Sequence, residues 1–223
     1  MKHVLAVLVR IALFAFVCWV FSLAAGARLS SGVNLAVIWA GVLVTFPLVG
    51  LARRFLDRHP ATGYAVWTTT LVHVGLGMTF GVPIVRAVVT HPDWRGWVLP
   101  VPPSIGEALV IVTGAAAFLT VMNLAVKGLG APFFIALSRK LSVDWMYAWT
   151  RNPMVLAALA FFLALGVWFR SALFVLWVLV PFTPALLFFI RVYEERELEI
   201  RFGAPYVEYK SRTPRLWPRK PGG

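Results

Sequence analysis

The sequence predicts an all-α membrane protein, a polytopic helical bundle with about six transmembrane helices, a C-terminal helical hairpin and an amphipathic cytoplasmic tail. Of the 223 residues, 60% are hydrophobic and only 13% are charged, and the mean hydropathy is +0.81. A soluble domain carries about a quarter charged residues, so this composition excludes an ordinary water-soluble globule as well as intrinsic disorder. Six apolar stretches are also long enough to cross a hydrocarbon core of about 30 Å, which takes about 20 helical residues.

Each apolar stretch is predicted to form one membrane-spanning helix. In chain order, the predicted helices cover residues 4–25, 34–52, 64–89, 105–126, 153–169 and 172–190. The last two predicted helices are separated by little more than Phe169, Arg170 and Ser171, so residues 153–190 should form a tight helical hairpin. The connection at residues 90–104 contains two Trp and four Pro, which is typical of an irregular segment at the membrane interface.

The first stretch allows a second interpretation. Lys2 and Arg10 resemble the basic start of a signal peptide, and Ala25-Gly26-Ala27 resembles a cleavage site. The apolar run is long for a signal peptide, so we expect a retained helix. The chain then divides into N-terminal transmembrane helices, residues 1–126, and a C-terminal module, residues 127–223, within one membrane domain.

The basic residues predict the orientation in the membrane. Short cytoplasmic loops are enriched in Lys and Arg. One set of alternating connections holds 16 of the 21 basic residues and the other holds 4, while Arg10 lies within the first stretch. Both termini are therefore expected in the cytoplasm, and the Arg content and short loops favour a prokaryotic inner membrane.

The net charge of +12 indicates the bilayer as the partner of this protein. Nucleic acid is not expected, because the charges lie between apolar runs. The oligomeric state is not predicted.

Ionisable residues inside the predicted helices are few. Only His73 clearly lies at mid-depth, and we interpret it as a histidine that is hydrogen-bonded between helices. A transporter would need several ionisable groups at this depth, so transport is disfavoured. The single cysteine, Cys18, lies in the first helix and cannot form an internal disulfide; no activating base is predicted beside it, so a cysteine nucleophile is not expected. No metal site is predicted.

Two polar segments should meet at the cytoplasmic face. Pro153 suits the first position of a helix, Asn152 suits its cap, and Arg151 adds a cation that binds carboxylates. The hairpin then returns to the same face with Glu194 and Glu195. A cationic and an anionic group at one surface fit a zwitterionic ligand. The alternative is a charged juxtamembrane helix whose side chains pair with each other at i,i+4, namely Arg191 with Glu195 and Glu197 with Arg201.

The order of these segments resembles a known family module. The segments are Arg151-Asn152-Pro153-Met154, Glu194-Glu195-Arg196-Glu197-Leu198, Phe202-Gly203, Tyr206, Tyr209 and Pro214-Arg215-Leu216-Trp217-Pro218. Over residues 128–218 this pattern is similar to the C-terminal module of the isoprenylcysteine carboxyl methyltransferase and phospholipid methyltransferase superfamily. The resemblance implies a membrane-embedded enzyme that uses S-adenosylmethionine and places its pocket between the last helices and the tail.

The resemblance also implies roles for individual residues. Arg151, Asn152 and Pro153 would line the amino-acid end of the cofactor, and Glu194 and Glu195 would hold its ammonium or ribose hydroxyls. Arg151 and Glu195 are the candidate catalytic residues. Further cofactor-binding candidates are Tyr147, Met154, Gly128 and Gly130, the two glycines resembling a Gly-x-Gly of the phospholipid branch. Tyr206 and Tyr209 would bind substrate or cover the adenine, unless they anchor the tail at the interface.

Four residues depart from the family pattern. Val155 replaces a usual Tyr, Ala157 a frequent Gly, and Trp145-Met146 a usual Gly-Pro. The function expected is methyl transfer to a lipophilic acceptor, which is a lipid amine, a prenylcysteine carboxylate or a small thiol. The alternatives are a non-catalytic membrane protein of the same fold, or an NADPH-dependent reductase, since sterol reductases have a similar C-terminal module.

Overall fold

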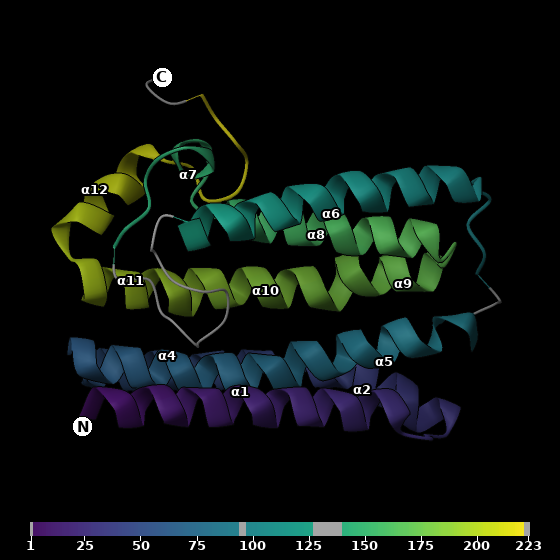
Figure 1. Ribbon diagram of the computed structural model, residues 1–223, viewed down its shortest axis with the longest axis horizontal. Coiled ribbons are helices and arrows are strands. Elements are labelled where there is room, and N and C mark those ends of the chain that lie inside the picture. The colour runs from purple at the N-terminus through teal and green to yellow at the C-terminus, as the bar shows by residue number, and fades with distance from the viewer. Residues whose placement is uncertain (1, 94–96, 127–139, 221–223) are drawn as a thin grey trace.

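The computed structural model describes residues 2–93, 97–126 and 140–220. Within these ranges the chain is helical, and the strand-like pairing there is an isolated antiparallel bridge between Val98 and Ser171. The long helices lie along a common direction and form a bundle (Figure 1). The predicted all-α fold is confirmed.

The N-terminal half forms the lower layer in Figure 1. It comprises α1 (Lys2–Gly26), α2 (Ser31–Leu43), α3 (Thr45–Arg58), α4 (Thr62–Leu76), the π-helical turn η1 (Gly77–Gly81), α5 (Val82–Thr90) and the short 3-10 helix η2 (His91–Asp93). Because α2 and α3 join end to end, as do α4, η1, α5 and η2, this half consists of three long helical rods. The rod α1 packs against α4 and α5.

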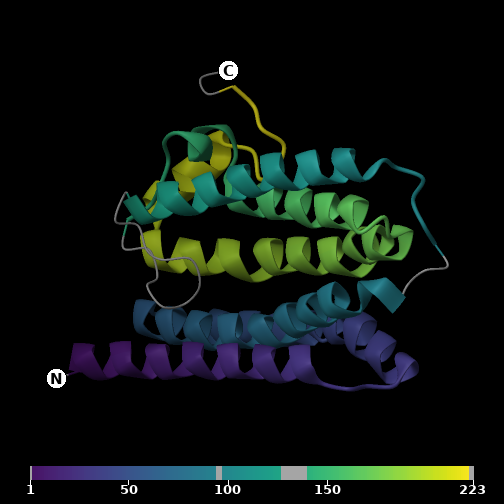
Figure 2. The ribbon, with the colours of Figure 1, turned by 45° about the vertical axis from the view of Figure 1, so that its right-hand side comes forward.

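The C-terminal half forms the upper layer. It comprises α6 (Pro103–Val126), α7 (Met146–Trp149), α8 (Pro153–Trp168), α9 (Ala172–Trp177), η3 (Val178–Phe182), α10 (Thr183–Phe189), η4 (Ile190–Glu194), α11 (Glu195–Phe202) and α12 (Ala204–Arg212). The predicted hairpin is present, with α8 and α9 joined by a turn in which Arg170 has φ 54° and the Ser171 hydroxyl accepts the Phe174 N–H. Figures 1 and 2 both show α6 beside α8, and the two helices are in contact.

The last long rod, from α9 to α11, is helical without a break over 31 residues, but it contains two π turns. Pro181 lies in η3, where the wider turn accommodates a residue without an N–H donor. The second π turn, η4, ends at Glu194. The rod continues 12 residues beyond the predicted end at residue 190, because α11 is a polar extension of an apolar helix.

The described residues contain five helices that are long and apolar enough to span a membrane. They are Leu5–Gly26, Ser31–Arg58, Thr62–Asp93, Pro103–Asn123 and Ala172–Phe202. The sixth predicted helix is α8, which is apolar but has 16 residues and is just shorter than the usual range of about 17 to 25. About six crossings therefore remain consistent with the structure.

Buried polar contacts join the rods. The fully buried Trp177 donates its indole N–H to the Ile38 carbonyl at 2.8 Å and so ties the two layers together. At the end of the bundle away from α11, Arg86 is only 3% exposed and donates to the backbone carbonyls of Ala24 and Ala27 and to Asn34 Oδ1. These contacts hold the end of α1 against α2 and α5.

The interpretation of His73 needs correction. Its Nδ1 lies 2.8 Å from the carbonyl of Thr69, one turn earlier in α4, so the hydrogen bond is within the helix and not between helices. The contact with a neighbouring helix is apolar, since the ring packs edge-on against Phe189. A polar atom close to the backbone of a helical residue can reach the carbonyl at i−4, so the Nδ1 of His73 has a partner without a second helix.

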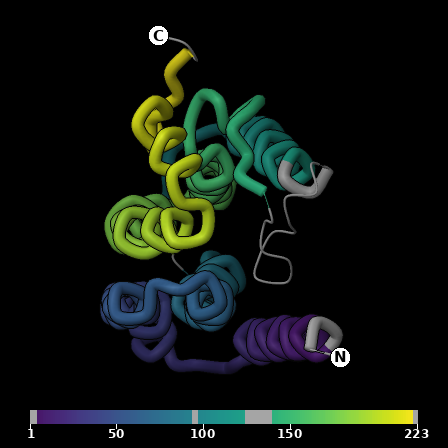
Figure 3. Tube along the Cα trace, turned by 90° about the vertical axis from the view of Figure 1, so that its left-hand side faces the viewer, coloured from purple at the N-terminus to yellow at the C-terminus, as the bar shows by residue number. Residues whose placement is uncertain are grey.

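The two chain ends lie toward the same end of the bundle (Figure 1). The helices α7, α11 and α12 gather there as well, and Figure 3 looks onto this end. The elements that carry the predicted site residues are therefore close together.

Candidate functional site

The site begins at the start of α8. Pro153 occupies the first turn of the helix, as predicted. Asn152 stands at the cap position, but its side chain does not cap the helix, so the predicted capping role is wrong. Its Nδ2 instead donates to the carbonyl of Arg215 at 3.0 Å.

A C-terminal strap, residues 213–219, runs over this segment and is bonded to it. The Arg151 N–H donates to the Pro214 carbonyl at 2.9 Å, and the Thr150 hydroxyl donates to the Arg215 carbonyl at 3.0 Å. The Arg219 N–H donates to the Trp149 carbonyl at 3.0 Å. Backbone contacts therefore fix the strap on the turn between α7 and α8.

Glu195 is the electrostatic centre of the site. Its side chain is 5% exposed, and its carboxylate receives Arg215 through Nε at 2.8 Å and Nη2 at 3.2 Å. Lys210 Nζ lies 3.1 Å from Oε2, and Arg151 Nη1 lies 3.0 Å from Oε1. One buried carboxylate thus faces three cations, which come from the segment before α8, from α12 and from the strap.

The i,i+4 alternative is half right. Glu197 pairs with Arg201 at 2.8 Å, as that alternative predicted. Glu195 pairs with Arg151, Lys210 and Arg215 rather than with Arg191. A helical spacing rule cannot detect partners that lie 15 to 44 residues away in the sequence.

Arg151 is buried but incompletely bonded. Its side chain is 8% exposed, and its Nε and Nη1 have no hydrogen-bond acceptor in the described structure. The contact of Nη1 with Glu195 is an ion pair without hydrogen-bond geometry. Buried donors without acceptors are costly and rare in native proteins, so Arg151 is suited to an anionic group of a ligand.

Glu194 places a second carboxyl group beside the cavity. It ends the π turn η4, which is held by a hydrogen bond between the Tyr193 hydroxyl and Thr69 at 3.0 Å and by Arg53, which donates to the Val192 carbonyl at 2.9 Å. In the part of the chain that the structure describes, no hydrogen bond or ion pair engages the Glu194 carboxylate. It is therefore available to a cationic group.

A cavity of about 150 Å³ brings most of the predicted site residues together. Its lining includes Tyr147, Arg151, Asn152, Met154, Glu194, Glu195, Tyr206 and Tyr209. Pro153 lies outside this cavity, and Gly128 and Gly130 lie outside the described residues. Sequence reasoning missed the cations Lys210 and Arg215, and also Lys140–Ser142, which line one side.

Three tyrosines supply uncharged polar groups around the cavity. Burial, with a contribution from the charge of Glu194, raises the pKa of Tyr147 to about 12, and burial also raises the pKa of Tyr206 and of Tyr209. All three hydroxyls thus stay protonated at neutral pH. Tyr206 and Tyr209 are 2% and 3% exposed, and the Tyr209 hydroxyl donates to the Tyr147 carbonyl at 2.7 Å. Their rings are enclosed by protein rather than standing at its surface.

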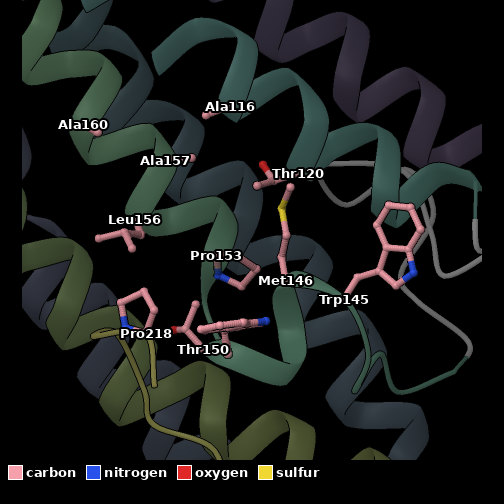
Figure 4. Close-up of a pocket in the computed structure, with 11 residues that line it drawn as sticks. Ala116, Thr120, Trp145, Met146, Thr150, Pro153, Leu156, Ala157, Ala160 and Pro218 are labelled. Carbon is pink, nitrogen blue, oxygen red and sulfur yellow. The ribbon is translucent and has the colours of Figure 1, made fainter. Parts of the chain in front are cut away.

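A second hollow, the apolar groove, lies on the other side of the same segment. It has a volume of about 560 Å³ and runs between α6 and α8 (Figure 4). Its lining comprises Ala116, Thr120, Trp145, Met146, Trp149, Thr150, Pro153, Leu156, Ala157, Ala160 and Pro218. Ala157 and Trp145-Met146, which depart from the family pattern, thus belong to this groove.

Comparison with known proteins agrees with the resemblance. The model of a family described as phospholipid methyltransferase matches residues 103–204, from the start of α6 to the start of α12. No curated protein sequence matches the chain. The matched range contains the segment before α8 and both cavity glutamates, whereas Tyr206, Tyr209 and the strap follow it.

Proposed function

We propose, from the match of residues 103–204 to the phospholipid methyltransferase family, that the protein is an integral membrane methyltransferase. The methyl donor would be S-adenosylmethionine and the acceptor a lipophilic molecule. The family match supports methyl transfer in a membrane, and the choice of donor and acceptor is our inference.

The observation that carries the donor assignment is that one cavity contains buried hydrogen-bond donors without acceptors and, separately, a carboxyl group without a partner. Arg151 offers buried donors and Glu194 offers a free carboxylate. The amino-acid end of S-adenosylmethionine has one carboxylate and one ammonium group, which these residues would bind as a charge-assisted pair. Glu195 would act as a positioning residue, because it is held by three cations and in turn holds Arg151.

Methyl transfer from S-adenosylmethionine requires few further catalytic groups from the protein. Bound S-adenosylmethionine supplies a methyl group on a positively charged sulfur, open to in-line displacement. The chain would align the donor, keep water away and hold the polar groups in place, which is a large part of catalysis in such reactions. A carboxylate or thiolate acceptor needs no base, while a protonated amine must first lose a proton.

The cavity of about 150 Å³ matches the amino-acid end of the donor and not the whole molecule, since ligand pockets usually measure about 300 to 1,000 Å³. We expect the cavity to widen on binding at Lys140–Ser142, because these lining residues are not part of a helix. The donor would arrive from the cytoplasm and the acceptor from the bilayer. This assignment of sides follows the distribution of basic residues.

Calorimetric titration of S-adenosylhomocysteine into the purified protein tests the proposal. We expect micromolar binding that weakens at least tenfold in Arg151→Ala and in Glu194→Gln. Arg191→Ala and Glu208→Gln are matched controls, because both side chains are exposed, and they should bind like the native protein. The absence of binding to the folded native protein would refute the proposal, and binding of NADPH in its place would favour the reductase alternative.

A further inference from the structure

The π turn η4 changes which residues of the last rod share a face. The Glu195 N–H donates to the Ile190 carbonyl, five residues earlier, whereas an α-helix would use the carbonyl four residues earlier. In a regular α-helix Glu195 would lie roughly 140° around the axis from Ile190, but the π bond gives it the position of an i+4 residue, roughly 40° away. Ile190, Glu194 and Glu195 consequently all line the polar cavity.

Glu194 is the member of this group that has the least support of its own. Ile190 is 1% exposed and packs in the hydrophobic core, and Glu195 is held by three cations. In the described structure, no hydrogen bond or ion pair engages the Glu194 carboxyl group. The position of this group in the cavity therefore depends on the backbone of the turn.

The backbone of the turn is held by α3, which belongs to the N-terminal half. Arg53 donates from Nη1 to the Val192 carbonyl at 2.9 Å and from Nε to Asp57 Oδ2 at 2.7 Å. Asp57 Oδ1 in turn accepts a hydrogen bond from Arg196 Nε at 3.0 Å. Arg53 and Asp57 thus bind the last rod at residues 192 and 196, on either side of Glu194.

These contacts contribute little to the stability of the whole bundle. The side chains of Arg53 and Asp57 are 35% and 43% exposed, and exposed ion pairs stabilise proteins only weakly. The buried hydrogen bond between Thr69 and the Tyr193 hydroxyl is a second attachment, so the rod stays docked on α4 when Arg53 is changed. A side chain that inserts into the backbone ladder of a helix is, however, a known cause of an irregular turn. The contact of Arg53 therefore matters for the shape of η4.

We infer that Arg53 is a positioning residue of the donor site, because its bond to the Val192 carbonyl fixes the π turn that directs Glu194 into the cavity. This inference rests on the proposed function, in which Glu194 binds the ammonium group of the donor. Arg53 lies outside residues 103–204, the range of the family match. The N-terminal half thus takes part in donor binding through α3.

The affinities of two ligands separate positioning from a general loss of structure. One ligand is S-adenosylhomocysteine, and the other is its deamino analogue, in which hydrogen replaces the amino group. We expect Arg53→Met to weaken binding of S-adenosylhomocysteine about threefold or more and to leave binding of the analogue within about twofold of the native value, because only the first ligand uses Glu194. Arg54→Met removes the same charge at the next position, where the side chain is exposed, and should bind both ligands like the native protein.

A double variant tests whether Arg53 acts through Glu194. In a Glu194→Gln background, Arg53→Met should not weaken binding of S-adenosylhomocysteine further, since the group that Arg53 positions is already lost. Arg53→Lys retains a donor for the Val192 carbonyl and should bind more tightly than Arg53→Met. Equal weakening for both ligands, or additive effects in the double variant, would overturn the inference.

Hydrogen–deuterium exchange tests the attachment without a ligand. Peptides that cover residues 190–198 should exchange faster in Arg53→Met than in the native protein or in Arg54→Met, because the turn is held less firmly. Unchanged exchange would overturn the inference, whether or not a ligand binds. Faster exchange in Arg53→Met, together with no binding of S-adenosylhomocysteine to the folded native protein, would refute the proposed function and keep Arg53 as the residue that positions Glu194.

Discussion

At the scale of single residues, the site depends on different surroundings for two neighbouring glutamates. Glu195 is enclosed by Arg151, Lys210 and Arg215, while Glu194 faces the cavity with no partner in the described structure. The first arrangement stabilises the protein, and the second leaves a charge for a ligand. The two side chains should therefore respond differently to the same substitution.

Replacing each glutamate by glutamine separates stability from binding. Glu195→Gln removes the charge that faces three cations, so we expect the free energy of unfolding to fall by about 2 kcal/mol. Breaking a buried pair costs about 3–5 kcal/mol, and the partial exposure of Lys210 and Arg215 reduces this figure. Glu194→Gln should unfold at the same or a higher temperature than the native protein, because it removes a carboxyl group that no cation neutralises in the described structure.

Thermal unfolding in detergent measures the difference. About 2 kcal/mol corresponds to a decrease of roughly 4–8 °C in Tm for a chain of this size. Equal unfolding temperatures for the two variants would contradict the assigned roles.

Sequence reasoning at this scale identified the types of residue but not their pairings. Arg151, Glu194 and Glu195 were predicted as one charged cluster, and all three line the cavity. The third cation at Glu195, Arg215, was not predicted, because it lies 20 residues further along the chain and reaches Glu195 only through the path of the strap. Trp145 was noted as a departure, but its positive φ could be known only from the structure.

At the scale of elements, the C-terminal strap is what closes the site. It contacts the α7–α8 turn through backbone groups of Trp149 and Arg151 and reaches Glu195 through Arg215. A short segment without secondary structure thus holds the turn, α12 and the last rod together. Its contribution can be removed without altering any helix.

Truncation after Arg212 should impair both binding and stability. It removes the Pro214 carbonyl and the Arg215 side chain, so Arg151 loses a backbone acceptor and Glu195 loses its bidentate partner. We expect binding of S-adenosylhomocysteine to weaken at least tenfold and the unfolding temperature to fall. Truncation after Lys220 leaves residues 213–219 in place and serves as the control. Native-like binding by the shorter chain would show that the strap is dispensable.

The positions of the apolar helices were predicted well, because they follow from composition. Irregularities within the helices were not predicted, because they depend on backbone geometry. Each helix in the described residues that is long and apolar enough to span a membrane coincides with a predicted apolar run, because length and hydropathy are sufficient for that purpose. The π turns η3 and η4 were not predicted, since the register of helical hydrogen bonds leaves no simple pattern in the sequence. The extension of the last rod to Phe202 lay outside the predicted span for another reason, since α11 is polar; the alternative of a charged juxtamembrane helix did place a helix there.

At the scale of the whole molecule, the residues of the candidate site lie at one end of the bundle. Both chain ends, α7, α11 and α12 lie there (Figures 1 and 3). The distribution of basic residues predicts that this end is cytoplasmic. The prediction concerns the membrane and can be tested without knowing the reaction.

Reporter fusions in a bacterial host test the orientation. A fluorescent protein that matures only in the cytoplasm should be active at either terminus, and alkaline phosphatase should be active when inserted between Leu99 and Val101. Insertion of the phosphatase between Arg58 and Ala61 is the control and should be inactive. The reverse pattern would overturn the predicted orientation and move the donor site to the other side.

The buried arginine at the opposite end of the bundle responds differently to acid. Arg86 is held by two backbone carbonyls and an amide oxygen, none of which takes up a proton in the range where carboxylates do. The ion pairs at the site end depend on the ionised carboxylate of Glu195 and weaken once it is protonated. Acidification should therefore loosen the hold of Lys210 and Arg215 on the last rod, while the backbone bonds of the strap and the contacts of α1, α2 and α5 persist.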